Sequence, residues 1–244
     1  MRPLRKTVCS LHVWLVLASG LAPAGIVLAQ GTIAYCQPSE PVWGYLGSEV
    51  DLNRDGQMEF RFYNASYPPA SYWATGVSGV GSASLLVIPH LWMADGGSSL
   101  APLPAGFLIG PTSDPALMWA THDAPNAYGA ALLLGSYIPE TVGGGLVPIG
   151  SFYGTTAFMG IHFQIGTDWH YGWVRIRGGT AGPSEDGQQF YLNPPAWVLD
   201  WAYETRPDTP IVAGAVPEPS TLALLVGGGV VLVWFRRKRN EGRG

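Results

Sequence analysis

The residues best suited to chemistry lie in one short acidic stretch, residues 51–59 (DLNRDGQME). Counted from Asp51, side chains with oxygen ligands stand at positions 1, 3 and 5, and a glycine at position 6 permits a tight turn. The backbone carbonyl of Gln57 and the carboxylate of Glu59 would add oxygens at positions 7 and 9. Hard oxygen donors at this spacing suit Ca²⁺. We predict a structural calcium site, with a metal-free turn as the alternative. Its ligands would be Asp51, Asn53, Asp55, Gln57 and Glu59.

The loop departs from the EF-hand pattern, because position 12, where an EF-hand has glutamate, is Phe62. It is similar instead to the D-x-[DN]-x-D-G-x-x-[DE] loops between strands in integrin-type propeller repeats. Residues 59–63 (EFRFY) alternate as a strand does, which fits that setting. The expected affinity is weak, in the ~10⁻⁴–10⁻³ M range of extracellular modules. Bound calcium would stabilise the folded state.

Signatures of catalysis are absent from the sequence, which has no G-x-S-x-G, H-E-x-x-H, P-loop or C-x-x-C motif. The glycine-rich stretch 76–81 (GVSGVG) fits no nucleotide fingerprint and predicts a flexible loop. His162 and His170 could approach each other across a hairpin, but a metal site needs further ligands. Carboxylate pairs for glycoside hydrolysis are not sequential, and nothing around the acids marks an acid and a base. We therefore predict that the protein is not an enzyme.

Aromatic side chains are plentiful, with 10 Trp, 11 Tyr and 8 Phe. Most large aromatics of a β domain belong to its core. Those predicted to lie in loops are better placed to stack on sugar rings. The candidates for contact with a glycan are Tyr72, Trp73, Trp169 and Trp197.

The elements that must hold these residues are short strands. Residues 30–212 show no long 3.6-residue apolar period, and short apolar runs alternate with Gly, Pro, Asn and Asp. The strands expected are 58–63, 84–88, 106–109, 130–134, 158–165, 170–177, 190–192 and 198–203. Residues 166–169 are expected to form a four-residue hairpin loop. The spacing predicts an all-β fold with a single antiparallel β-sandwich of jelly-roll or lectin-like type, with a barrel as the alternative.

The charge of this region excludes one class of partner. Between residues 30 and 216 there are five arginines, no lysine and fifteen acids, a net charge of −10. Binding to a phosphate backbone requires clustered Lys and Arg. We therefore expect no nucleic acid as partner.

Residues 1–29 have the pattern of a secretory signal peptide, with Arg2, Arg5 and Lys6 ahead of an apolar stretch. We predict cleavage before Gln30, with an uncleaved anchor as the alternative. Cys9 would leave with the signal. Cys36 would then be the sole cysteine of the exported domain, whose core must hold without an intrachain disulfide.

The C-terminus has an uncharged apolar run at residues 222–235, followed by Arg236-Arg237-Lys238-Arg239. As a helix this run would be about 21 Å long, short of a ~30 Å hydrocarbon core, so it could span only with its flanks or a thinned membrane. The basic cluster is expected on the cytoplasmic side. The acidic domain would then lie outside.

Pro217-Glu218-Pro219, the apolar run and the basic end, in this order, resemble the PEP-CTERM sorting signal of Gram-negative bacteria. The resemblance implies export, a stay in the inner membrane through the C-terminal helix, and processing by an exosortase, a membrane cysteine transpeptidase-like enzyme. It also implies that Pro217, Glu218 and Pro219 are the recognition element. An ordinary tail anchor is the alternative. Segments 158–163, 170–175, 200–204 and 210–214 resemble the bodies of many such proteins, which are commonly associated with exopolysaccharide and biofilm or floc formation.

The sequence thus predicts a signal peptide at 1–29, a β-sandwich domain at 30–212, a linker at 213–216 and a sorting signal at 217–244. The expected function is that of a protein at the cell surface or in the extracellular matrix. Its role would be structural or adhesive and linked to exopolysaccharide or biofilm. The alternative is a secreted carbohydrate-binding or glycan-active protein on the same sandwich.

Overall fold

The fold is seen in a computed structural model, which describes residues 33–44, 47–67, 72–89, 98–111, 114–121, 131–138, 147–183, 190–191 and 194–217. Every regular element in these ranges is a β-strand. None of them contains an apolar helix of membrane-spanning length. The all-β prediction is therefore confirmed for this part of the chain. The predicted signal peptide and the predicted C-terminal helix lie outside the described residues.

Seventeen strands are present in the described ranges, and each of the eight expected strands overlaps one of them. They are β1 (Ile33–Cys36), β2 (Val42–Gly44), β3 (Glu49–Val50), β4 (Phe60–Tyr67), β5 (Tyr72–Gly79), β6 (Ser84–Pro89), β7 (Ser98–Leu100), β8 (Leu108–Ile109), β9 (Met118–Ala120), β10 (Ala131–Tyr137), β11 (Val147–Ile149), β12 (Thr156–Ile165), β13 (Asp168–Gly178), β14 (Gly182–Pro183), β15 (Phe190–Tyr191), β16 (Ala196–Glu204) and β17 (Ile211–Val212).

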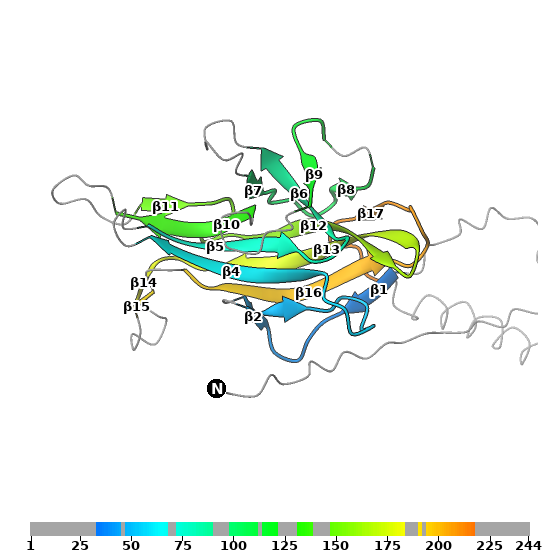
Figure 1. The fold of residues 1–244 in the computed structure, drawn as a ribbon, viewed down its shortest axis with the longest axis horizontal. Coiled ribbons are helices and arrows are strands. Elements are labelled where there is room, and N and C mark those ends of the chain that lie inside the picture. Colours follow the sequence, from blue (N-terminus) through cyan, green and yellow to red (C-terminus); the bar gives the residue numbers. More distant parts are fainter. Residues whose placement is uncertain are drawn as a thin grey trace, which may run out of the picture.

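One curled sheet of thirteen strands organises the molecule (Figure 1). Its main path runs β1-β16-β13-β12-β6-β7-β10-β5-β4-β3, with β2 beside β16, β9 beside β6 and β11 beside β10. The β7–β10 pair is parallel, so the sheet is mixed. The predicted antiparallel sandwich of two sheets is not confirmed, because twist accumulates along one continuous sheet and bends it into a half-barrel. Register shifts in the β5–β10 and β13–β16 ladders, with the extra residue in β10 and β16, add local bends.

The β12–β13 hairpin is the longest ladder, with ten paired residues from Thr156↔Arg177 to Ile165↔Asp168. The predicted four-residue loop is wrong, because only Gly166 and Thr167 join the two strands. Gly166 has φ of +64°, a value that glycine adopts without steric cost and that a two-residue hairpin requires.

The concave face of the sheet carries the larger core cluster. Met159 and Ile161 of β12 and Phe60 and Phe62 of β4 are fully buried in it. These strands are not neighbours in the sheet, but the curl brings them face to face. Strand β2, beside β16, also approaches β4 closely across this core, because a Cβ at Gly44 would lie 2.6 Å from Cε1 of Phe62. The curled sheet thus packs like a sandwich without having two sheets.

The convex face carries a second cluster, built on Tyr171 and Trp173 of β13. Residues 101–110 and the short β8–β17 ladder cover it. Gly106 donates its N–H to the carbonyl of Ala213 at 3.0 Å, and Ala213 donates to Phe107 at 2.8 Å. Trp173 Nε1 donates to the carbonyl of Ala215 at 3.1 Å. Ordered packing therefore continues through Ala215.

The glycine-rich stretch 76–81 is not the flexible loop that we expected, because most of it lies in β5. Gly79 touches the neighbouring backbone so closely that a Cβ there would lie 2.1 Å from the carbonyl oxygen of Ala83. The glycine therefore serves close packing. Cys36, the sole cysteine expected in the exported domain, is buried in β1.

A buried carboxylate joins three strands. Asp200 of β16 accepts a hydrogen bond from Arg175 Nε of β13 at 2.8 Å and one from the Tyr35 hydroxyl of β1 at 2.9 Å. Arg175 Nη2 contacts the second carboxylate oxygen as well. Burial, followed by the hydrogen bond to Asp200, raises the pKa of Tyr35 to about 12. The phenol therefore stays protonated and keeps donating to Asp200.

Replacing Asp200 should test this junction. Asp200→Ala leaves the Tyr35 hydroxyl and the half-exposed Arg175 guanidinium without their acceptor, so the free energy of unfolding should fall by about 2–3 kcal/mol. Urea unfolding of the variant and of Asp168→Ala, an exposed aspartate at the start of β13, measures the difference. The control should change by less than ~0.5 kcal/mol, and an equal loss in both variants would show that the junction stabilises nothing.

Candidate functional site

The predicted calcium loop connects β3 to β4 at one edge of the sheet. Its neck is closed by the pairs Val50↔Phe60 and Glu49↔Arg61, whose side chains form an ion pair. The N–H of Glu59 donates to the carbonyl of Val50 at 3.0 Å. Both ends of the loop are therefore held before any ion binds.

Inside the loop, Asp51 organises the backbone. Its Oδ1 accepts from the N–H of Arg54 at 2.5 Å, and its Oδ2 accepts from the N–H of Gly56 at 3.0 Å. Arg54 and Gly56 have φ of 66° and 90°. The chain thus turns back so that the residues following Asp51 return towards its carboxylate.

Asn53 and Gln57 both contact Asp55. Asn53 Oδ1 accepts from the N–H of Asp55 at 3.0 Å, and Asn53 Nδ2 donates to Asp55 Oδ2 at 3.1 Å. The N–H of Gln57 donates to Asp55 Oδ1 at 2.7 Å. These contacts fix the side chain of Asp55 within the loop.

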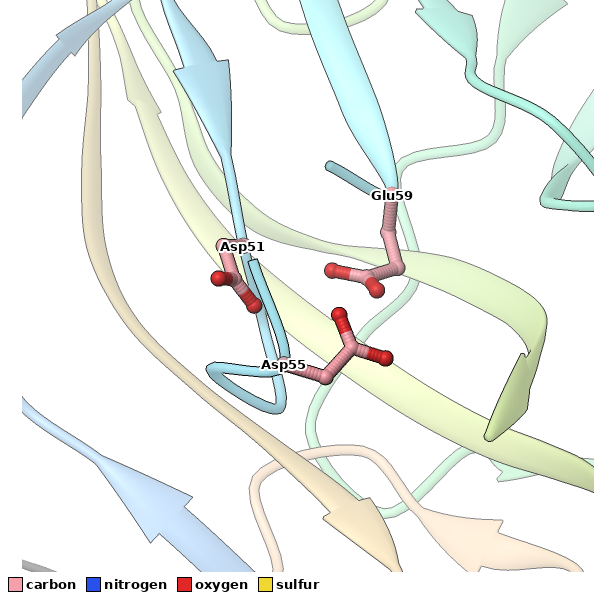
Figure 2. A group of neighbouring side chains, drawn as sticks. All are labelled: Asp51, Asp55 and Glu59. Atoms are coloured by element: carbon pink, nitrogen blue, oxygen red, sulfur yellow. The ribbon is translucent and has the colours of Figure 1, made fainter. Parts of the chain in front are cut away.

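Three of the five predicted ligands come together as a cluster. Figure 2 shows the carboxylates of Asp51, Asp55 and Glu59 facing one another, and an oxygen of each lies within 4.8 Å of the others. Two oxygens that bind the same Ca²⁺ at 2.3–2.6 Å can be no more than about 5.2 Å apart. The spacing of the three carboxylates is therefore compatible with one calcium ion.

Glu59 differs from the other two acids of the cluster because it is buried, with only 5% of its surface exposed. Its Oε2 accepts from the N–H of Leu52 at 2.6 Å. The pKa of Glu59 is raised to about 8, mainly by burial and also by the charges of Asp51 and Asp55, although the N–H of Leu52 acts to lower it. No ion pair of the described residues includes these three acids. A divalent cation would supply the missing positive charge.

The loop also rests on the sheet. Leu52 is buried, and its carbonyl accepts a hydrogen bond from Trp201 Nε1 of β16 at 3.1 Å. Burial, followed by the charge of Glu59, raises the pKa of Tyr203, also on β16. A change in the order of the loop would therefore also change its contacts with Trp201 and Tyr203 of β16.

Without metal, the free energy of unfolding should fall as the pH rises from about 4.5 to 8. Between these values the folded state keeps the Glu59 proton, with its pKa of about 8, while the unfolded chain has lost it near 4.5. One pKa unit corresponds to ~1.4 kcal/mol, so the loss is on the order of a few kcal/mol. Saturating calcium at pH 8 should reverse it, since the ion replaces the proton. Thermal unfolding from pH 5 to 8, in EDTA and in calcium, measures both effects.

Glu59→Gln provides the matched variant, because the amide keeps an oxygen for the N–H of Leu52 but carries no charge. It should lose both the pH dependence and the calcium response. Glu40→Gln, an exposed residue between β1 and β2, should keep them. A calcium-induced rise in Tm that is the same for wild type and Glu59→Gln, or absent from both, would contradict the site.

The four candidate glycan contacts do not form one surface. Trp73 is partly buried in β5, and Tyr72 begins that strand, its side chain lying outside the description. Trp169 and Trp197 lie near opposite ends of β13, because Trp197 pairs with Arg177. Eight residues of strand separate Trp169 from Arg177, roughly 26 Å.

Trp169 belongs instead to an aromatic cluster on the convex face. His162 stacks on Trp169 and on Tyr171, each with ring centroids 4.4 Å apart, and Trp119 of β9 packs against His162 at 5.5 Å. Burial lowers the pKa of His162, so its ring is neutral at pH 7. Trp119 was not among the four candidates selected from the sequence, because only the β6–β9 pairing brings it to this cluster.

The two histidines of the hairpin do not meet. His162 pairs with Tyr171 and His170 with Phe163, so alternation places their side chains on opposite faces of the sheet. His170 is buried, and its Nδ1 donates to the carbonyl of Glu204 at 2.8 Å. A metal site shared by this pair is excluded by the register.

Trp197 has a different set of neighbours. It lies opposite Trp43 in the β2–β16 pair and opposite Arg177 in the β13–β16 pair. The Arg177 guanidinium carbon lies 4.5 Å from the Trp197 ring centroid, and Trp43 is 47% exposed. The selection of loop aromatics left out Trp43, and the sequence did not indicate Arg177, because only the sheet register places both beside Trp197.

At the C-terminal end, the described chain leaves the domain through Val216 and Pro217, which are both exposed. Glu218 and Pro219, the rest of the predicted recognition element, lie outside the described residues. The recognition element thus starts two residues after Ala215, the last residue hydrogen-bonded to Trp173.

The described part of the chain is thus a folded all-β domain that the chain leaves through two exposed residues. The family model of the PEP-CTERM protein-sorting motif matches residues 215–239. The chain therefore carries a PEP-CTERM sorting motif, which confirms the prediction from the sequence of residues 217–244. The motif indicates export, anchoring in a membrane before processing, and exosortase-dependent sorting to the cell surface. No curated protein and no solved structure matches the chain.

Proposed function

We propose that this protein is a structural or adhesive component of the surface or extracellular matrix of a Gram-negative bacterium, linked to exopolysaccharide or biofilm. The observation that carries the proposal is the sorting motif at residues 215–239, placed directly after a folded β domain. Exosortase would be its processing partner. The domain itself would act after it reaches the surface.

A role without catalysis is supported by the contacts of three buried polar groups, Asp200, His170 and Glu204. Asp200 is bound by Arg175 and Tyr35, and His170 by the carbonyl of Glu204. Glu204 in turn accepts from the N–H and side chain of Arg206. Each of these groups has a structural partner, which leaves it poorly placed to transfer protons to a substrate.

Calcium enters this proposal as a structural ion. The cluster of Asp51, Asp55 and Glu59 would bind it at the β3–β4 connection. By ordering the loop, the ion would also stabilise the hydrogen bond from Trp201 to the carbonyl of Leu52. Calcium at extracellular concentrations would then stabilise the exported protein once it is outside the cell.

Processing of the tail tests the proposal in cells. The wild-type protein should lose the C-terminal segment in cells that have exosortase and keep it in cells that lack it, because the motif is the feature the enzyme reads. Glu218→Gln should retain the tail in both, while Glu241→Gln, which lies beyond the basic cluster, should be processed as the wild type is. Mass spectrometry of the C-terminus, joined to fractionation, measures this. An intact chain that stays soluble in the cytosol of wild-type cells would refute the proposal.

A second candidate function, binding of carbohydrate, is favoured by Trp43. This exposed indole lies opposite Trp197, and Arg177 lies on the other side of Trp197 with its guanidinium over the Trp197 ring. Arg177 forms no ion pair with a described residue. Sugar rings stack on exposed indoles, and an unpaired guanidinium favours a sugar that carries a carboxylate. The ligand class would be an acidic polysaccharide.

Trp43→Ala should weaken binding of a uronate-containing polysaccharide by about 3–10-fold, the range expected when one aromatic contact is lost. Isothermal titration with the exosortase-processed protein measures it. Met118→Ala removes an equally exposed apolar side chain from β9 and should leave binding unchanged. Equal affinities for both variants and the wild type would exclude this surface. Turnover of the polysaccharide that a single carboxylate-to-amide change abolishes would instead favour the glycan-active alternative.

A further inference from the structure

A small apolar patch surrounds the point where the chain leaves the folded domain. In the β8–β17 ladder, Ile109 pairs with Ile211 and Leu108 with Val212. The two isoleucines are buried against the convex face, so alternation turns Leu108 and Val212 outwards, where they are 58% and 40% exposed. Val216, 45% exposed, follows four residues later. We call Leu108, Val212 and Val216 the tether patch.

The two segments that form the tether patch carry no charge. Residues 101–113 and 209–217, the two segments that form it, contain no Asp, Glu, Lys or Arg. The outward face of a ladder in water is ordinarily polar. Of the large apolar side chains exposed in the described ranges, the only others are Trp43 and Met118. The apolar surface is therefore concentrated at the root of the C-terminal tail.

The domain holds the chain firmly up to this point. The N–H of Ala215 donates to the carbonyl of Val212 at 2.9 Å, and its carbonyl accepts from Trp173 Nε1 at 3.1 Å. The main chain of Ala213 is paired with Gly106 and Phe107. The free tether therefore begins at Val216.

The tether is short. Six residues, 216–221, separate Ala215 from the apolar run that begins at Leu222. Fully extended they reach at most about 25 Å, and the headgroup layer alone takes roughly 5–8 Å of it. A folded unit of about 180 residues has a radius of gyration of roughly 16 Å. The domain therefore cannot move away from the bilayer by its own width, and the surface nearest the lipid is the root of the tether.

We propose that, before exosortase acts, the tether patch inserts into the boundary between headgroups and acyl chains of the membrane that holds the apolar run. The β8–β17 edge then faces the bilayer, and residues 217–219 lie at the membrane surface, where a membrane enzyme can reach them. Three apolar side chains bind lipid weakly on their own, so loss of the run by processing releases the domain. The contact is an orienting one that lasts only until sorting is complete.

Depth-dependent quenching tests this contact in the full chain. Leu108→Cys, labelled with an environment-sensitive fluorophore, is reconstituted into phosphatidylethanolamine–phosphatidylglycerol vesicles with and without nitroxide-labelled lipid. Pro148→Cys, an exposed position in β11 at the far end of the molecule from β8 and β17 (Figure 1), is the control. Nitroxide lipid should cause a loss of emission at Leu108→Cys and none at Pro148→Cys, and Val212→Cys should behave as Leu108→Cys does.

Flotation of the same vesicles separates the outcomes. A chain that floats with the vesicles but shows equal emission at positions 108 and 148 overturns the docking and leaves membrane anchoring intact. A chain that does not float overturns anchoring, and the docking with it. A label at position 108 that becomes shielded only when exosortase is added identifies the patch as a contact for the enzyme, which also overturns the proposal.

Discussion

Burial of both faces of the ribbon formed by β12, β13 and β16 is the constraint on which the rest of the structure depends. The concave face of this ribbon packs Met159 and Ile161 against strands from the other end of the sheet, and the convex face packs Trp173 beneath β8 and β17. A strand pair covered on both faces must be apolar on both. The core is therefore divided in two by the sheet itself.

Both functional regions are attached to this ribbon by a tryptophan. Trp201 holds the acidic loop through the carbonyl of Leu52, and Trp173 holds the start of the tail through the carbonyl of Ala215. The indole N–H of a buried tryptophan requires an acceptor, and in each case the acceptor is a backbone carbonyl of a segment far away in the sequence. The same hydrogen bonds that satisfy the core thus fix the position of the loop and the exit of the chain.

Strands were predictable where apolar alternation was strong. The hairpin of β12 and β13 is the clearest example, because Met159, Ile161 and Phe163 repeat at every second residue. Strands without such a signal were not predicted. They include β5, whose glycines led us to expect a loop, and the two-residue β17. These strands exist because neighbours from elsewhere in the chain pair with them, which local sequence cannot reveal. The predicted two-sheet packing failed for a related reason, since curl is a property of the whole sheet.

The sequence by itself determined that the protein carries a sorting motif and how the acids at residues 51–59 are spaced, because the motif and the acidic loop are each contiguous in the chain. Only the tertiary structure decided that Glu59 is buried beside Asp51 and Asp55, that Trp43 lies next to Trp197, and that Leu108 lies at the root of the tail. The reason is that each of these depends on strands distant in sequence meeting in one register. The sequence determines which groups lie near one another along the chain, and folding determines which of them are buried together.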